Sequence, residues 1–260
     1  MTLTASRPER LEVAIHEPAH ARPLGQVETR QLLEEVRRSC QARVVAFDLD
    51  STLLDNRPRS ARIMREFGHE VGEPQLLKAA PAHWHDWSAR RAMQNIGLSA
   101  DAIDQHITAH EDFWAKRFFT SAYCEYDAAV AGAPAFARVV QSAGAIVVYL
   151  TGRPERTREG TLRSLQRLGF PLPGEGHTEL RMRTSAYGSD DDFKSTAIDA
   201  LGALAPVAAA FDNEPTHINL YRALLPAHAR SVHLATDHSG RAVALLDGIV
   251  SIRDFDTSAG

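Results

Sequence analysis

The sequence has few of the residues that mark an exported or membrane-bound protein. It has only two cysteines, Cys40 and Cys124, which lie far apart and in no spacing typical of a disulfide framework or a metal site. No uninterrupted apolar run approaches the ~18 residues of a membrane-spanning helix, and residues 1–26 contain no apolar segment of signal-peptide length. These absences predict a protein of the reducing cytoplasm with no membrane partner.

Positive charge is not in excess either. The net charge is −4 and there is no concentrated basic tail, so the sequence has no electrostatic footprint for nonspecific nucleic-acid binding. The expected partner is a small anion. At 260 residues and 44% apolar, the chain can form one sizeable core and a small accessory domain. Its oligomeric state cannot be inferred from the sequence.

Two carboxylates follow the apolar run at residues 44–47. If the chain stays extended there, Asp48 and Asp50 share a direction, because side chains alternate along a strand. Two close carboxylates repel, which raises one pKa or recruits a cation, so one group can be a nucleophile while the other carries a proton. The alternative is a strand that ends in a turn or helix cap, where Asp is also favoured.

A second apolar run, at residues 145–150, ends in Thr151, Gly152, Arg153 and Pro154. The Thr151 hydroxyl and the Gly152 backbone N–H are groups that a phosphate oxygen needs, and a helix N-terminus just beyond them would favour an anion. An N-cap threonine before a helix-initiating proline would explain the same residues.

Two further signals follow along the chain. Lys194 precedes an amphipathic stretch at 197–204 and could neutralise the first aspartate and a phosphate, although a lysine at a helix start is most often solvated. The apolar run at 207–211 ends in Asp212, which is either another carboxylate at the end of a strand or an Asx-turn before the next helix.

In this order, the four signals resemble the four motifs of the haloacid dehalogenase (HAD) superfamily, over roughly residues 43–236 apart from a central insertion. The resemblance implies that Asp48 attacks phosphorus and forms an aspartyl-phosphate. It implies that Asp50 protonates the leaving alcohol and later activates water. Thr151, Gly152 and Lys194 would bind the phosphoryl oxygens.

The resemblance also implies a Mg²⁺ ion held by Asp48, by the Asp50 backbone carbonyl and by Asp212. The fourth motif commonly has a second acid at set positions where this chain has none. Asn213 could orient a metal-bound water and is included as a provisional ligand, while Glu214 could contact the lysine of the third motif or cap the next helix.

The second aspartate, Asp50, limits the types of reaction that the resemblance implies. Family members that cleave carbon–halogen bonds lack an acid at that position, so Asp50 indicates phosphomonoester hydrolysis or phosphoryl transfer. The leading interpretation is a phosphatase acting on a small phosphomonoester. The alternatives are a phosphotransferase or mutase, a nucleic-acid end phosphatase and a catalytically silent binding module. The segment 150–170 is similar to acid phosphatases and polynucleotide phosphatase domains, and the silent module is suggested by the unusual Asn213–Glu214 pair.

Alternating strands and helices predict an α/β fold, a Rossmann-like three-layer core around a parallel sheet, with an inserted α-helical cap. The expected regions are an irregular arm at 1–26, a catalytic core at 27–55 and 127–260, and the cap at 56–126. Helices are expected near 27–40, 134–142, 154–168, 194–204 and 215–224, and strands near 43–48, 145–150, 180–183, 207–211, 231–235 and within 248–255.

The expected cap carries aromatic residues at helical spacing. Its cluster His83-Trp84-His85-Asp86-Trp87 could in principle bind a metal or stack a nucleobase. The histidines lack further ligands at recognisable spacing, and tryptophans at helical spacing are more often core residues, so packing is the preferred interpretation.

Overall fold

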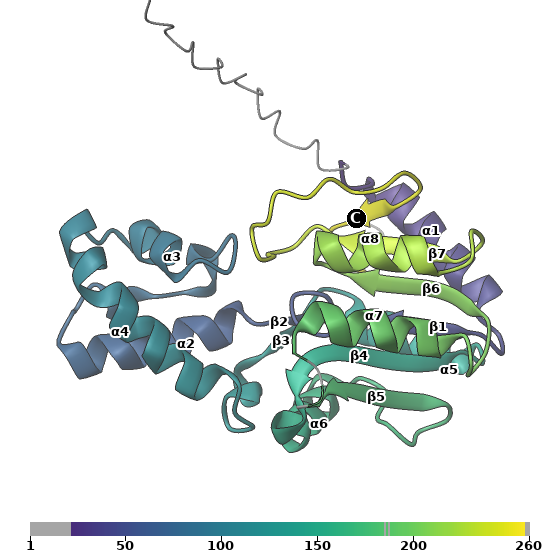
Figure 1. Cartoon of the computed structure of the whole chain (residues 1–260), viewed down its shortest axis with the longest axis horizontal. Helices are drawn as coiled ribbons and strands as arrows, with labels where there is room; N and C mark the ends of the chain where they lie inside the picture. Colours follow the sequence, from purple (N-terminus) through teal and green to yellow (C-terminus); the bar gives the residue numbers. More distant parts are fainter. Residues whose placement is uncertain (1–21, 185, 187, 258–260) are drawn as a thin grey trace, which may run out of the picture.

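The computed structural model describes residues 22–257 except 185 and 187, so most of the arm expected at 1–26 lies outside the described residues. A six-stranded sheet forms the centre of the molecule, and every pair of neighbouring strands in it is parallel (Figure 1). In order across the sheet, the strands are β5 (Thr178–Arg183), β4 (Ile146–Pro154), β1 (Val44–Phe47), β6 (Val207–Asp212), β7 (Arg230–Leu234) and β8 (Val250–Ile252).

The central strands are apolar because both faces of the sheet are covered. All residues of β1 and β6 are buried, which is the pattern of parallel strands with helices on both sides. The flanking helices are α1 (Gln26–Ser39), α5 (Ala133–Ser142), α6 (Arg158–Leu168), α7 (Asp190–Leu201) and α8 (Pro215–Leu224). Helices α1, α5 and α6 contribute to the core on one face, and α7 and α8 to the core on the other. The predicted α/β fold with a central parallel sheet is confirmed.

Two predicted boundaries differ from the structure. Helix α7 begins at Asp190, not near Lys194, because the Ser189 hydroxyl caps it by accepting a hydrogen bond from the Asp192 N–H, and three aspartates in its first turn suit the helix dipole. Strand β4 continues through the Thr151–Pro154 segment with an irregular register, so α6 begins at Arg158 and not near residue 154.

A second, two-stranded ribbon leads out of the sheet after the first motif. It pairs β2 (Leu54–Asp55) with β3 (Ala128–Ala129) in antiparallel register. The chain between these strands forms α2 (Arg57–Val71), η1 (Leu76–Lys78), η2 (Pro81–His83), α3 (Ala89–Ile96), α4 (Ala100–Phe118) and η3 (Tyr123–Tyr126). We call this segment, residues 57–126, the helical insertion; it has its own hydrophobic core and projects from one end of the sheet (Figure 1).

A short 3-10 helix, η4 (Glu155–Thr157), connects β4 to α6. Both cysteines, Cys40 and Cys124, are free and buried. Within residues 22–257, apart from 185 and 187, no helix is both long and apolar enough to span a bilayer.

Candidate active site

Lys194 joins the first and last acidic motifs. Its ammonium, fully buried, donates to Asp48 Oδ1 at 2.6 Å, to Asp212 Oδ2 at 3.0 Å and to the Leu150 carbonyl at 2.8 Å. These residues meet because β4, β1 and β6 are neighbours, and the carboxyl ends of parallel strands lie at one edge of a sheet. The structure therefore brings together three of the residues that the sequence selected.

The two carboxylates differ in proton affinity. Burial raises the pKa of Asp48 to about 7; Asp212 and Asp50 add to this rise, and the Lys194 ammonium opposes it. Burial acts in the same direction on Asp212, but Lys194 and His217 outweigh it and lower the pKa of that carboxyl. Tyr221 also donates its hydroxyl to Asp212 Oδ2 at 3.0 Å. Asp212 thus has two positive neighbours, Lys194 and His217, and its pKa falls where that of Asp48 rises.

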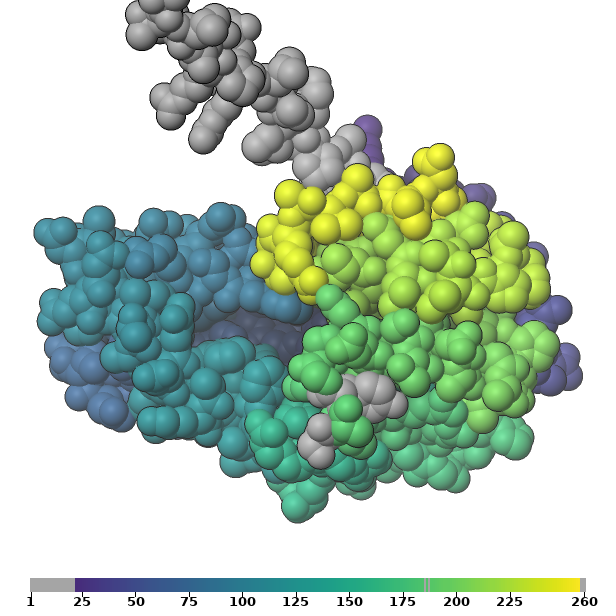
Figure 2. Space-filling view, viewed as in Figure 1, coloured from purple at the N-terminus to yellow at the C-terminus, as the bar shows by residue number. Residues whose placement is uncertain are grey.

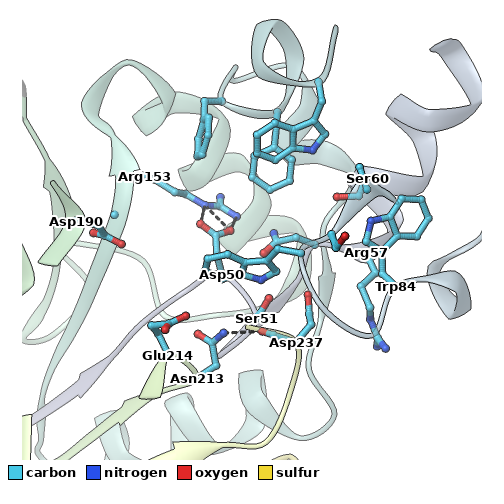
Figure 3. A pocket seen from close by; sticks show the side chains of 18 of the residues that line it. Asp50, Ser51, Arg57, Ser60, Trp84, Arg153, Asp190, Asn213, Glu214 and Asp237 are labelled. Carbon is cyan, nitrogen blue, oxygen red and sulfur yellow. Dashed lines mark hydrogen bonds and ion pairs between the residues drawn. The ribbon is translucent and has the colours of Figure 1, made fainter. Parts of the chain in front are cut away.

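Asp50 is held by an arginine that the sequence interpretation did not assign. Arg153 Nε lies 3.0 Å from both Asp50 carboxylate oxygens, and its Nη2 donates to Oδ1 at 2.6 Å, as the dashed lines in Figure 3 show. Burial would raise the pKa of Asp50, but the charge and hydrogen bonds of Arg153 outweigh it and lower that pKa. Asp50 is therefore ionised beside this guanidinium.

Asp127, at the end of the helical insertion, links Arg153 to that insertion. Its fully buried carboxylate accepts from Arg153 Nη2 at 2.7 Å, from Arg59 Nε at 2.8 Å and Nη2, and from Asn56 Nδ2 at 2.9 Å. Arg59 belongs to α2, whereas Arg153 belongs to β4. One carboxylate therefore ties the insertion to the arginine that holds Asp50.

The Thr151–Gly152 segment lies at the irregular end of β4. The Thr151 hydroxyl is buried and accepts a hydrogen bond from the Arg153 N–H at 3.2 Å, which stabilises the backbone at Gly152. The lack of a side chain at Gly152 lets the Asp190 carboxylate approach the backbone, because a Cβ there would lie 2.3 Å from that carboxylate. Arg183, at the end of β5, donates from Nε to the Gly152 carbonyl at 3.2 Å and puts a second guanidinium beside this segment.

The residues after Asp212 bind neighbouring loops. Asn213 Oδ1 accepts from the Thr52 hydroxyl at 3.1 Å, and its Nδ2 donates to the Asp237 carbonyl at 2.7 Å. The Glu214 carboxylate accepts hydrogen bonds from the Ser239 hydroxyl at 2.9 Å and from the Ser239 N–H at 3.1 Å. Among the described residues it neither contacts Lys194 nor caps α8 with its side chain. Both side chains fix the loop that follows β7 against the first motif.

The donors here fit a hard divalent cation. Asp48 and Asp212 supply carboxylate oxygens around one point, where the Lys194 ammonium contacts both. Among the described residues, no three His, Cys, Asp or Glu side chains form a metal cluster. A cation between the two carboxylates would therefore also need uncharged oxygens, such as the Asp50 carbonyl or the Asn213 amide.

A cavity of about 430 Å³ opens between the sheet and the helical insertion. Figure 2 shows the hollow from outside, and Figure 3 shows Asp50 and Arg153 at its centre with Trp84 and Ser60 on the insertion side. The residues of the core that line it include Asp48, Asp50, Gly152, Arg153, Arg183, Asp190, Asp212, Asn213 and Asp237. Thr151 and Lys194 are not among the lining residues.

No protein-family model and no curated protein matches the sequence. Solved structures do match. Protein tyrosine kinase A from Mycobacterium tuberculosis is 18% identical, with 84% of this chain and 96% of that one covered and a TM-score of 0.50. A haloacid dehalogenase-like hydrolase from Streptococcus pneumoniae is 13% identical, with 80% and 93% covered and a TM-score of 0.47. The class C acid phosphatase of Bacillus anthracis is 17% identical, with 74% and 61% covered and a TM-score of 0.42.

At these identities the likeness concerns the fold. The sheet order β5-β4-β1-β6-β7-β8, with helices on both faces and a helical insertion after the first strand, is the arrangement that the HAD resemblance predicts. The chain thus has a three-layer α/β fold around a central parallel sheet, similar to that of the Mycobacterium tuberculosis protein.

Proposed function

We propose that the protein is a Mg²⁺-dependent phosphatase, which hydrolyses a small phosphomonoester through an aspartyl-phosphate intermediate. The observation that carries the proposal is the buried Lys194 ammonium bonded to both Asp48 and Asp212, with Asp48, Asp50 and Asp212 lining one cavity. A nucleophilic carboxylate, a second acid and a buried cation at one point suit phosphoryl transfer. The free thiols of both cysteines support a reducing, cytoplasmic setting.

The reaction has two displacements at phosphorus. A carboxylate oxygen of Asp48 attacks, the bond to the alcohol oxygen breaks, and Asp50 gives that oxygen its proton. Asp50 then takes a proton from water, whose oxygen attacks the aspartyl-phosphate and releases Asp48 and inorganic phosphate. A positioned acid contributes a factor of about 10² to 10⁴, because an alkoxide is a poor leaving group at neutral pH. Asp50→Asn should therefore slow turnover more than it weakens binding.

Arg153 suits one of these steps better than the other. It lowers the pKa of Asp50, which favours the ionised base that takes a proton from water. For the first step Asp50 has to be protonated, and the negative charge of a bound phosphate nearby raises its proton affinity. The approach of the substrate therefore shifts Asp50 toward the acid form that the first displacement needs.

The phosphoryl oxygens need donors and positive charge. We assign the donor role to the Gly152 N–H, with Thr151 bracing its segment. Lys194 supplies the positive charge from behind Asp48, because its ammonium already donates to Asp48, Asp212 and the Leu150 carbonyl. Arg183 adds a second guanidinium that lines the same cavity beside Gly152. Together these groups would bind a dianion without help from a helix N-terminus.

A Mg²⁺ ion would be held by the Asp48 and Asp212 carboxylates, with the Asp50 carbonyl and the Asn213 amide as the uncharged donors. When bound, it supplies positive charge that offsets the negative charge of the transferred group. The meeting of the Asp48 and Asp212 carboxylates at the Lys194 ammonium supports this assignment. His217, whose Nδ1 lies 3.7 Å from Asp212 Oδ1, orients that carboxylate from the other side.

The test is hydrolysis of p-nitrophenyl phosphate by the purified protein. We expect activity that EDTA abolishes and excess Mg²⁺ restores, and that Asp48→Asn lowers by about 10³-fold or more, the scale of removing a nucleophile. Glu35→Gln is the control, because Glu35 pairs with Arg230 on the surface at 2.9 Å and neither residue lines the cavity. Activity that survives in Asp48→Asn, or no activity toward any phosphate ester, would overturn the proposal.

A further inference from the structure

The cavity has two chemically different ends. The end at the sheet is acidic, with Asp48, Asp50 and Asp212. The end at the helical insertion is aromatic, with Trp84, Trp87, Trp114, Phe118 and Phe119 among its lining residues. The chain has three tryptophans, and all three line this one cavity.

These aromatic side chains brace one another. Trp114 stacks on Phe118 with ring centroids 4.4 Å apart and an interplanar angle of 25°, and Phe119 meets Trp114 edge to face at 5.6 Å. Trp84 is almost fully buried, whereas Trp87 is 52% exposed. The backbone N–H of Trp87 donates to the His238 carbonyl at 3.4 Å, which joins the insertion to the loop after β7. The aromatic end is therefore a wall of supported rings with one exposed ring at its edge.

His110, on α4, lines the cavity beside this wall. Its side chain is 1% exposed, and neither ring nitrogen has a hydrogen-bond partner among the described residues. Its ring packs edge to face on Phe67 at 5.3 Å. Burial lowers the pKa of His110 to about 4, so at neutral pH it offers one donor and one acceptor. Buried polar atoms are nearly always paired, which indicates a partner from outside the chain.

We propose that the substrate's leaving alcohol carries a planar aromatic heterocycle, as in a nucleoside 5′-monophosphate, which stacks on the aromatic end of the cavity while His110 hydrogen-bonds its edge. This inference rests on the proposed phosphatase function and names its substrate class. A ring with polar edges matches both features, because its faces need apolar or aromatic contact and its edge needs the unpartnered nitrogens of His110.

A simple sugar phosphate matches this end less well. Each of its hydroxyls would need a polar partner. The insertion side offers Ser60, Ser88 and Glu111 beside its aromatic rings, and the arginines there are already paired. Arg57 donates to both carboxylate oxygens of Asp55, and Arg90 donates to Asp104 at 2.7 Å. A nucleoside monophosphate places its hydroxyl-bearing ribose between the two ends and leaves only the base against the aromatic wall.

Binding can be measured without turnover in the Asp48→Asn variant. Adenosine 5′-monophosphate and ribose 5-phosphate differ only by the base, so their affinities isolate its contribution. Tryptophan fluorescence is the readout, because every tryptophan lines the cavity. We expect the nucleotide to bind about tenfold or more tightly than ribose 5-phosphate and to quench the fluorescence, since stacking on an aromatic side chain contributes on that scale.

Two substitutions and a control locate the effect. In the Asp48→Asn background, His110→Phe and Trp87→Ala should each weaken nucleotide binding about threefold to tenfold and leave ribose 5-phosphate binding unchanged. His106→Phe is the matched control, because His106 lies one turn earlier on α4 and also packs on Phe67, at 6.1 Å, but does not line the cavity. It should change neither affinity.

The outcomes separate this inference from the proposed function. Equal affinity for the two ligands, or no binding of either, overturns the inference, and p-nitrophenyl phosphate hydrolysis that depends on Asp48 would still support the phosphatase. Loss of both affinities in His110→Phe would also overturn it, because the substitution would then act on the whole site. Tight nucleotide binding in a protein without phosphatase activity would remove the proposed function and leave the aromatic base site in place.

Discussion

Asp127→Asn tests the connection between the helical insertion and the sheet. The substitution keeps the shape of the side chain and removes its charge. Asp127 has no exposed side-chain surface and accepts hydrogen bonds from Arg59, Arg153 and Asn56, and both arginines are 1% exposed. The amide of asparagine would turn a donor toward one guanidinium and leave the positive charges less compensated.

The expected loss follows from this burial. Removing one partner of a buried ion pair costs about 3–5 kcal/mol, because the remaining charge stays desolvated. Arg153 keeps Asp50 as a second partner, but Arg59 keeps only the Phe118 carbonyl and the face of the Phe118 ring. We therefore expect the free energy of unfolding to fall by about 3 kcal/mol, the lower end of that range.

Urea unfolding followed by tryptophan fluorescence and by circular dichroism is the assay. All three tryptophans lie in the helical insertion, so fluorescence reports on that part, while circular dichroism reports on the whole chain. Asp104→Asn removes the carboxylate of an exposed pair, with 67% of the Asp104 side chain and 48% of the Arg90 side chain accessible, and should cost less than about 1 kcal/mol. If the two variants lost equal stability, the reasoning about the buried carboxylate would be refuted.

Two further predictions concern single positions. Gly160→Ala should destabilise the protein by about 1–3 kcal/mol, because the new Cβ would lie 2.3 Å from the Ser121 backbone carbonyl. Gly202→Ala should be neutral or slightly stabilising, because Gly202 has right-handed helical backbone angles and its Cβ would make ordinary contacts. Chemical denaturation of both variants checks this. His110 has a folded-state pKa of about 4 against an ordinary 6.5, so the unfolded chain binds more protons between these pH values and stability falls as pH falls through that window. The loss between pH 7 and pH 4.5 should be about 2.5 kcal/mol smaller in His110→Phe than in the unsubstituted protein, and equal losses would contradict a buried neutral histidine.

The parallel sheet is the part of the structure that the sequence predicts best. Apolar runs at 44–47, 145–150 and 207–211 favour buried parallel strands between helices, and in the structure the first lies between the other two. Once they are neighbours, the residues that follow them meet at one edge, which is why Asp48 and Asp212 could be paired from sequence alone. Lys194 meets them although its helix starts earlier than expected, because its long side chain reaches the strand ends from α7.

Other site residues carry no local signal. Arg153 looks like an ordinary charged residue before a proline, and its contacts with Asp50 and Asp127 depend on an irregular strand end that periodicity does not reveal. At the same irregular strand end, the Thr151 hydroxyl accepts a hydrogen bond from the Arg153 N–H. His110 reads as one polar residue in an amphipathic helix, and only the packing of α4 shows that it is buried without a partner.

Asp127 affects both the position of the helical insertion and the proton affinity of Asp50. Its carboxylate lies at the end of the helical insertion and binds Arg59 on that insertion and Arg153 on the sheet, while Arg153 also holds Asp50. Arg153 thus divides its N–H donors between two carboxylates, and its charge acts on both. A substitution at Asp127 therefore acts on the position of the insertion and on the proton affinity of Asp50 together, through a single guanidinium.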